Sequence, residues 1–92
     1  MNPGEIRTAI ANKAHSDKLD LTSPHHAFVV AKFTPQAATA GPLLWTFESS
    51  HEAQSFAERQ YGEVFLMSTN PQHGLQRVQG GKLVFIDEGT KV

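Results

Sequence analysis

Apolar and polar residues alternate along several stretches of the chain, and each of these stretches predicts a β-strand. Residues 27–34, AFVVAKFT, are rich in Phe and Val and stop at Pro35. Residues 43–47, LLWTF, place Leu43, Trp45 and Phe47 on one strongly apolar face. In the last third of the chain, Gly80-Gly81 separates LQRVQ from KLVFI, which predicts a β-hairpin over about residues 75–87.

A helical spacing of apolar residues occurs near the start of the chain. Asn2 and Glu5 have the spacing of a capping box, and Pro3 suits a first helical position. Ile6 and Ile10 then recur on one face. The pattern predicts a helix over about residues 3–18, with a thin apolar stripe that packs lightly.

A second helix is predicted directly after the strand at 43–47. Ser49 and Glu52 have capping-box spacing, and Gly62 provides a stop signal. The apolar face consists of Ala53, Phe56, Ala57 and Tyr61. EVFLM, residues 63–67, follows almost without a loop and is nearly continuously apolar, which is typical of a strand that is covered on both faces or central in its sheet. The short loops predict a compact β-α-β crossover.

The expected order of elements is therefore α-β-β-α-β-β-β. We predict one α+β domain over residues 1–92, a two-layer sandwich in which two helices pack on one face of a mainly antiparallel sheet. A chain of 92 residues has room for one domain with a modest core.

Charge and composition narrow the classes of function. Eight Lys and Arg balance nine Asp and Glu, giving a net charge of −1, and no basic run is present. This balance argues against a nucleic-acid partner. The chain has no cysteine, so disulfides, thiolate zinc sites and cysteine nucleophiles are absent. With no apolar block for a leader peptide or a membrane span, we expect a cytoplasmic protein without a membrane partner.

The five histidines are the main candidates for chemistry. His25 and His26 are adjacent in a segment expected to be extended, so their side chains should diverge and could not easily share a metal. His51 falls in the first turn of the second helix, where the helix dipole favours a neutral ring that can act as a base. Ser, His and Glu at 50–52 are neighbours on one helix turn and do not converge as a triad. We expect neither a metal nor a cofactor, and interpret these residues as capping and solvent-exposed groups.

The leading hypothesis is a small non-enzymatic protein–protein interaction module, of the adaptor or inhibitor type. Its partner would be another protein or a second copy of the chain, bound through sheet edges and the surface around the 75–87 hairpin. Trp45 and Tyr61 combine a ring with a polar group, as interface anchors do. The full set of expected contact residues is Trp45, Tyr61, His51, His26 and Arg77.

Two alternatives stay open from the sequence. The first is a small-ligand-binding protein or enzyme whose site lies between subunits and uses His51 or His26 for proton transfer. It requires a pocket at the start of the helix over 50–61. The second is a weak nucleic-acid binder, which requires Lys32, Arg77 and Lys82 to gather on one face.

Overall fold

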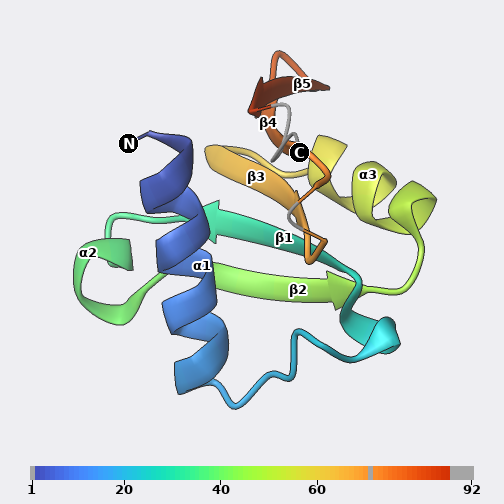
Figure 1. The fold of residues 1–92 in the computed structure, drawn as a ribbon. Helices are drawn as coiled ribbons and strands as arrows, with labels where there is room; N and C mark the ends of the chain where they lie inside the picture. The colour runs from blue at the N-terminus through green and yellow to red at the C-terminus, as the bar shows by residue number, and fades with distance from the viewer. Residues whose placement is uncertain (1, 71, 88–92) are drawn as a thin grey trace.

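The computed structural model describes residues 2–70 and 72–87, which form a single five-stranded antiparallel sheet with helices on both of its faces (Figure 1). The strands are β1 (Phe28–Phe33), β2 (Leu43–Phe47), β3 (Glu63–Ser68), β4 (Leu75–Gln79) and β5 (Lys82–Asp87). Their order across the sheet is β2-β1-β3-β4-β5. The α+β class, the antiparallel sheet and the order of the main elements confirm the prediction from sequence.

The two main helices, α1 (Pro3–Ser16) and α3 (Ser50–Glu58), pack on opposite faces of the sheet, so the prediction that both lie on one face was wrong. Alternate residues of β1 demonstrate the arrangement. Val29 belongs to the core cluster beneath α1, whereas Val30 belongs to the cluster beneath α3. The molecule therefore has three layers, and the cause is the continuously apolar β3, which needs cover on both sides.

α1 begins where the sequence predicted, but it ends two residues earlier than predicted. The Asn2 side chain accepts a hydrogen bond from the Glu5 N–H at 2.8 Å. At the other end Lys18 adopts a φ of 59°, and its N–H and that of Leu19 bond to the carbonyls of His15 and Ala14. This closing pattern is a Schellman motif, which shortens the helix relative to the predicted 3–18.

The β-α-β unit is split by another strand. β2 and β3 both pair antiparallel with β1, which lies between them, so they run parallel to each other without touching as neighbours. α3 connects them, with Ser49 as its N-terminal cap as predicted. Two short elements were not expected: the 3₁₀ turn η1 (Pro24–His26) and the four-residue helix α2 (Ala37–Ala40). No helix in the described part of the chain has the length and apolar character needed to cross a bilayer.

The C-terminal hairpin has the predicted turn. Gly80 and Gly81 have φ values of 61° and 79°, which the two central positions of a type I′ turn require. The register slips once near the open end, because Leu75 faces Asp87 while Gln76 faces Phe85. Ile86 is thus the extra residue of a β-bulge, and the regular part of β5 is Lys82–Phe85.

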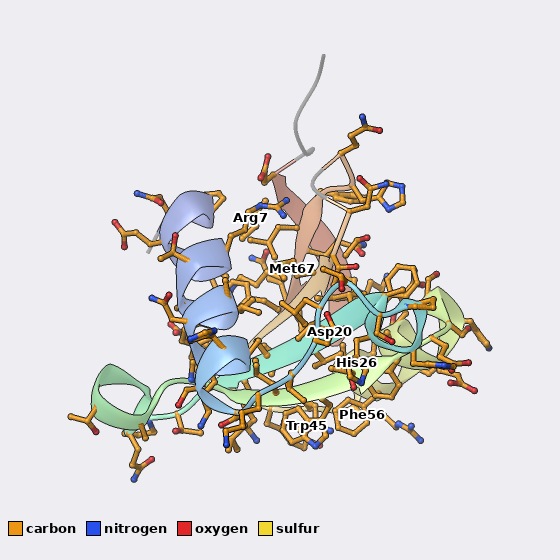
Figure 2. The ribbon with its side chains drawn as sticks, turned by 60° about the horizontal axis from the view of Figure 1, so that its bottom comes forward. Arg7, Asp20, His26, Trp45, Phe56 and Met67 are labelled. Carbon is orange, nitrogen blue, oxygen red and sulfur yellow. The ribbon has the colours of Figure 1, made fainter. Side chains whose placement is uncertain are left out.

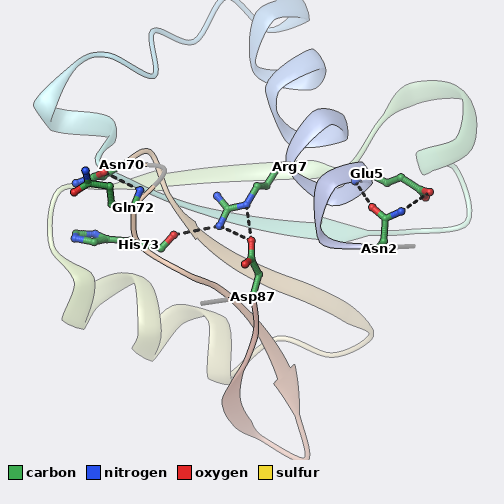
Figure 3. Close-up of polar contacts among 7 residues, drawn as sticks. All are labelled: Asn2, Glu5, Arg7, Asn70, Gln72, His73 and Asp87. Atoms are coloured by element: carbon green, nitrogen blue, oxygen red, sulfur yellow. Dashed lines mark hydrogen bonds and ion pairs between the residues drawn. The ribbon is translucent and has the colours of Figure 1, made fainter. Parts of the chain in front are cut away.

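One arginine ties the hairpin to the first helix (Figure 3). Nη2 of Arg7 lies 3.1 Å from Oδ2 of Asp87 and donates to the His73 carbonyl at 3.1 Å. These contacts join α1 to the end of β5 and to the loop before β4, segments that are far apart in the sequence.

Candidate functional site

The aromatic residues chosen from the sequence do not form one surface. The Trp45 ring lies 5.0 Å from the Phe56 ring, centroid to centroid, and is partly buried beneath α3 (Figure 2). Tyr61 lies in the turn after α3 and is 87% exposed. Trp45 therefore contributes mainly to packing, and Tyr61 is the one of the two that is open to contact.

The paired histidines belong to a 3₁₀ turn and not to an extended segment, which corrects the prediction. Ser23 and Pro24 begin this turn, with the Ser23 hydroxyl accepting from the His25 N–H at 3.2 Å. Nδ1 of His25 contacts Oε1 of Glu48, and Nδ1 of His26 lies 2.9 Å from the Asp20 carbonyl oxygen. The two rings are thus directed to different partners on neighbouring segments.

Asp20, beside His26 in Figure 2, is held by Thr22. The Thr22 hydroxyl and N–H both donate to Oδ1 of Asp20, at 2.5 and 2.9 Å. These hydrogen bonds, the side-chain one first, lower the pKa of Asp20 below its ordinary value of 3.8. The network stabilises the connection between α1 and β1.

His51 is exposed in the first turn of α3, whereas His25 and His26 lie in the 3₁₀ turn before β1. Among the residues that the structure describes, no three His, Asp or Glu side chains gather in a way that could hold a metal ion.

Lys32 does not share a face of the sheet with Arg77 and Lys82. Arg77 is paired with Phe65, and its guanidinium lies 5.9 Å from that ring on the α1 side of the sheet. Lys32 is two residues from Val30 and so points to the α3 side. Lys32 and Arg77 therefore do not form the common basic surface that nucleic-acid binding would require.

Two features remain as candidate sites, and the first is the edge strand β5. Val84 and Phe85 are 44% and 61% exposed, and Ile86 follows at 36%. Val84 faces Arg77 and so points to the α1 side, whereas Phe85 faces Gln76 and points to the α3 side. The strand therefore presents apolar side chains in both directions at the margin of the sheet.

The second feature is a cavity of about 290 Å³ beside the start of α3. It is lined by Phe28, Ser50, Gln54, Leu66, Ser68, His73, Gly74, Gln76 and Phe85. On its wall, Nδ1 of His73 lies 3.1 Å from Oγ of Ser68, which also accepts from the Asn70 N–H at 3.2 Å. A pocket thus exists near the helix start, but its histidine is His73, and neither His51 nor His26 lines it.

The sequence indicated the 75–87 hairpin as a contact surface and the start of the helix over 50–61 as the place of a pocket, but it did not identify the residues that form either feature. KLVFI in a hairpin resembles a strand buried on both sides, and only the strand order places it at an edge. Ser68 and His73 are five residues apart across a loop, a spacing that matches no catalytic or metal-binding motif. The one available signal was the cluster of polar and turn-forming residues in STNPQHG.

Comparison with protein-family models, with curated proteins and with solved structures finds no significant match to this chain.

Proposed function

We propose that this chain is a small non-enzymatic protein–protein interaction module of the adaptor or inhibitor type, which binds an extended segment of a partner protein along β5. The observation that carries the proposal is the run of exposed apolar side chains on an edge strand, Val84, Phe85 and Ile86. No described strand pairs with the outer edge of β5. An added strand gains main-chain hydrogen bonds there and places alternate side chains against Val84 and Phe85.

Edge strands that must avoid pairing normally carry charges, prolines or bulges. β5 has such features only at its ends, with Lys82 at the start and the bulge at Ile86. The regular stretch between them is apolar, which leaves room for a short partner strand. A cytoplasmic location, expected from the cysteine-free composition, is part of the same proposal.

Charge favours a partner with an acidic residue over a second copy of the chain. Lys82 and Arg77 flank Val84 on the α1 side of the sheet, and both are exposed. Antiparallel pairing of two copies about Val84 would bring two such basic pairs to one interface, which like-charge repulsion opposes. An acidic side chain on a foreign strand instead neutralises them.

The test is selection of short random peptides displayed on phage against the immobilised protein, with counter-selection on the Val84→Glu variant. Enriched peptides should alternate apolar residues, include Asp or Glu, and shift the NMR amide signals of β5. Binding should weaken about ten-fold or more with Val84→Glu, because the carboxylate removes the apolar contact at the centre of the strand and repels the acidic residue of the peptide. Gln72→Glu, an exposed substitution in the loop before β4, is the matched control and should bind as the original protein does.

Peptides that bind Val84→Glu equally well, or a selection that enriches nothing, would contradict the proposal. Concentration-dependent dimers that Val84→Lys abolishes would assign this edge to a second copy and overturn the choice of an acidic partner strand. Tyr61, exposed but distant in sequence from β5, stays a prediction of a second contact.

A further inference from the structure

We propose that the cavity beside the start of α3 binds a small, neutral, planar ligand with a carboxamide-like edge. This proposal does not depend on strand addition at β5, because it uses side chains on the α3 side of the sheet and not the outer edge of the backbone. The cavity walls come from α3, from strands β1, β3, β4 and β5, and from the loop that ends at Gly74.

The walls divide into an apolar and a polar part. The apolar part consists of Phe28, Leu66 and Phe85, and the polar part of Ser50, Gln54, Ser68, His73 and Gln76. A mostly apolar hollow with a few convergent polar groups is the usual form of a small-molecule site. Because Phe85 is 61% exposed, its ring has free surface against which a planar group can pack.

The charge of the lining determines the charge of the ligand. Among the residues that the structure describes, no Asp, Glu, Lys or Arg lines the cavity. An ionic ligand would lose hydration on entering and meet no counter-ion, which disfavours binding. A neutral ligand avoids this penalty.

The polar groups that are free for a ligand offer both donors and acceptors. The Gln76 carboxamide makes no hydrogen bond to any other described residue, and the Gln54 carboxamide is engaged only by a long 3.5 Å contact with the Ser50 hydroxyl. Each carboxamide can donate and accept at once. They therefore match a ligand whose edge carries a C=O beside an N–H, such as an amide or a lactam.

Ser68 and His73 form the rigid part of the wall. The Ser68 oxygen already interacts with the Asn70 N–H and with Nδ1 of His73, which fixes the orientation of the imidazole ring. Nε2 of His73 has no partner among the described residues and supplies a further donor or acceptor. The volume of about 290 Å³ is near the lower end of ligand pockets, which run from about 300 to 1,000 Å³, so the ligand is a single ring system.

The test is an NMR titration of the full chain with nicotinamide, a planar ring that bears a carboxamide. We expect saturable shifts at the backbone amides of Gln54, Ser68 and Gln76. Nicotinate, which has the same ring with a carboxylate, should bind at least about ten-fold more weakly because its charge finds no partner in the cavity.

Two variants of the same strand make the test specific. Gln76→Leu should weaken nicotinamide binding about ten-fold, the effect of losing a hydrogen bond to a polar group that becomes buried. Gln79→Leu, an exposed position on β4 that does not line the cavity, should leave binding unchanged. If Gln76→Leu does not fold, Gln54→Ala replaces it with the same expectation.

The proposal is overturned if nicotinamide gives no saturable shift, if nicotinate binds equally well, or if the cavity variant and the Gln79→Leu control bind alike. Peptide binding at β5 is measured separately, so the failure of one proposal leaves the other standing.

Discussion

Lys18 shows how a single residue can hold a turn at the expense of backbone strain. Its φ of 59° lies in the left-handed region, which glycine adopts readily and other residues adopt at a cost of about 1–2 kcal/mol. The sequence predicted that this helix ends near residue 18, but it offered no glycine to mark the closing residue. Backbone hydrogen bonds therefore hold this Schellman motif in place, although its closing residue is not the glycine by which such a motif is usually recognised in a sequence.

Replacing Lys18 with glycine should raise the free energy of unfolding by roughly 0.5–1 kcal/mol, because the relief of strain exceeds the entropy that glycine adds to the unfolded chain. Denaturant unfolding followed by circular dichroism measures the change. Lys18→Ala is the matched control, since it removes the charge and keeps the strain. An equal gain in Lys18→Ala would mean that charge, and not φ, is responsible.

At the scale of the elements, the sequence predicts best where a local signal is sufficient. The caps at Asn2 and Ser49 and the Gly80-Gly81 turn lie where the spacing placed them. The strand expected over residues 27–34 is found at Phe28–Phe33. Each of these depends on the hydrogen bonds and dihedral angles of a few neighbouring residues.

The face on which each helix packs could not be obtained in the same way. The apolar stripe of a helix, thin in α1 and stronger in α3, indicates how much apolar surface the helix buries. It does not indicate which face of the sheet the helix covers. The relevant constraint was the continuous apolar run of β3, which requires cover on both sides. In a chain of this size, two helices on one face would leave the other face of β3 uncovered. The structure instead places one helix on each face.

Gly74 lies so close to β5 that there is no room for a side chain at this position. A Cβ built there would lie 2.3 Å from the Asp87 carbonyl oxygen and 2.7 Å from a Phe85 ring carbon. Gly74→Ala should therefore displace the open end of the hairpin and destabilise the fold by about 1–3 kcal/mol, the usual effect of overpacking.

Denaturant unfolding tests this expectation, with Gly4→Ala as the control in α1. The nearest atom to a Cβ at Gly4 is the Asn2 side-chain oxygen at 3.4 Å, so the substitution is accommodated and alanine favours the helix. A loss of stability at Gly4 as large as that at Gly74 would show that close approach to β5 is not the cause.

At the scale of the whole molecule, Arg7 joins the first helix to the last described strand. Arg7→Leu keeps an aliphatic stem on α1 but removes the ion pair with Asp87 and the hydrogen bond to the His73 carbonyl. We expect a loss of about 1 kcal/mol and faster hydrogen exchange at the amides of β5, because both contacts hold the hairpin end.

Lys13→Leu is the control for this prediction, since Lys13 also makes an ion pair, with Asp17 one turn along the same helix at 3.2 Å. An ion pair between residues one turn apart on a helix contributes roughly 0.3–0.5 kcal/mol, and its loss should leave exchange in β5 unchanged. Equal effects of the two substitutions would mean that Arg7 contributes only as a surface charge.

The candidate sites were the least predictable feature because they depend on strand order. Val84 and Phe85 are exposed because β5 is the last strand of the sheet, and the cavity is formed where the start of α3, the β3–β4 loop and Phe85 of β5 come together. No local pattern in the sequence indicates that β5 is an edge strand or that these segments enclose a cavity. The sequence identified Trp45 as a surface anchor, yet the strand order and α3 together make it part of the packing.

The position of β1 between β2 and β3 has a consequence for synthesis on the ribosome. The first two strands can pair as soon as both have emerged, but the opposite edge of β1 finds its partner only when residues 63–68 appear. Until then the nascent hairpin exposes the unpaired edge of Phe28–Phe33, an apolar strand of the kind that associates with other chains. The split crossover thus places a vulnerable stage of folding between the synthesis of β2 and that of β3, and the arrival of β3 ends it.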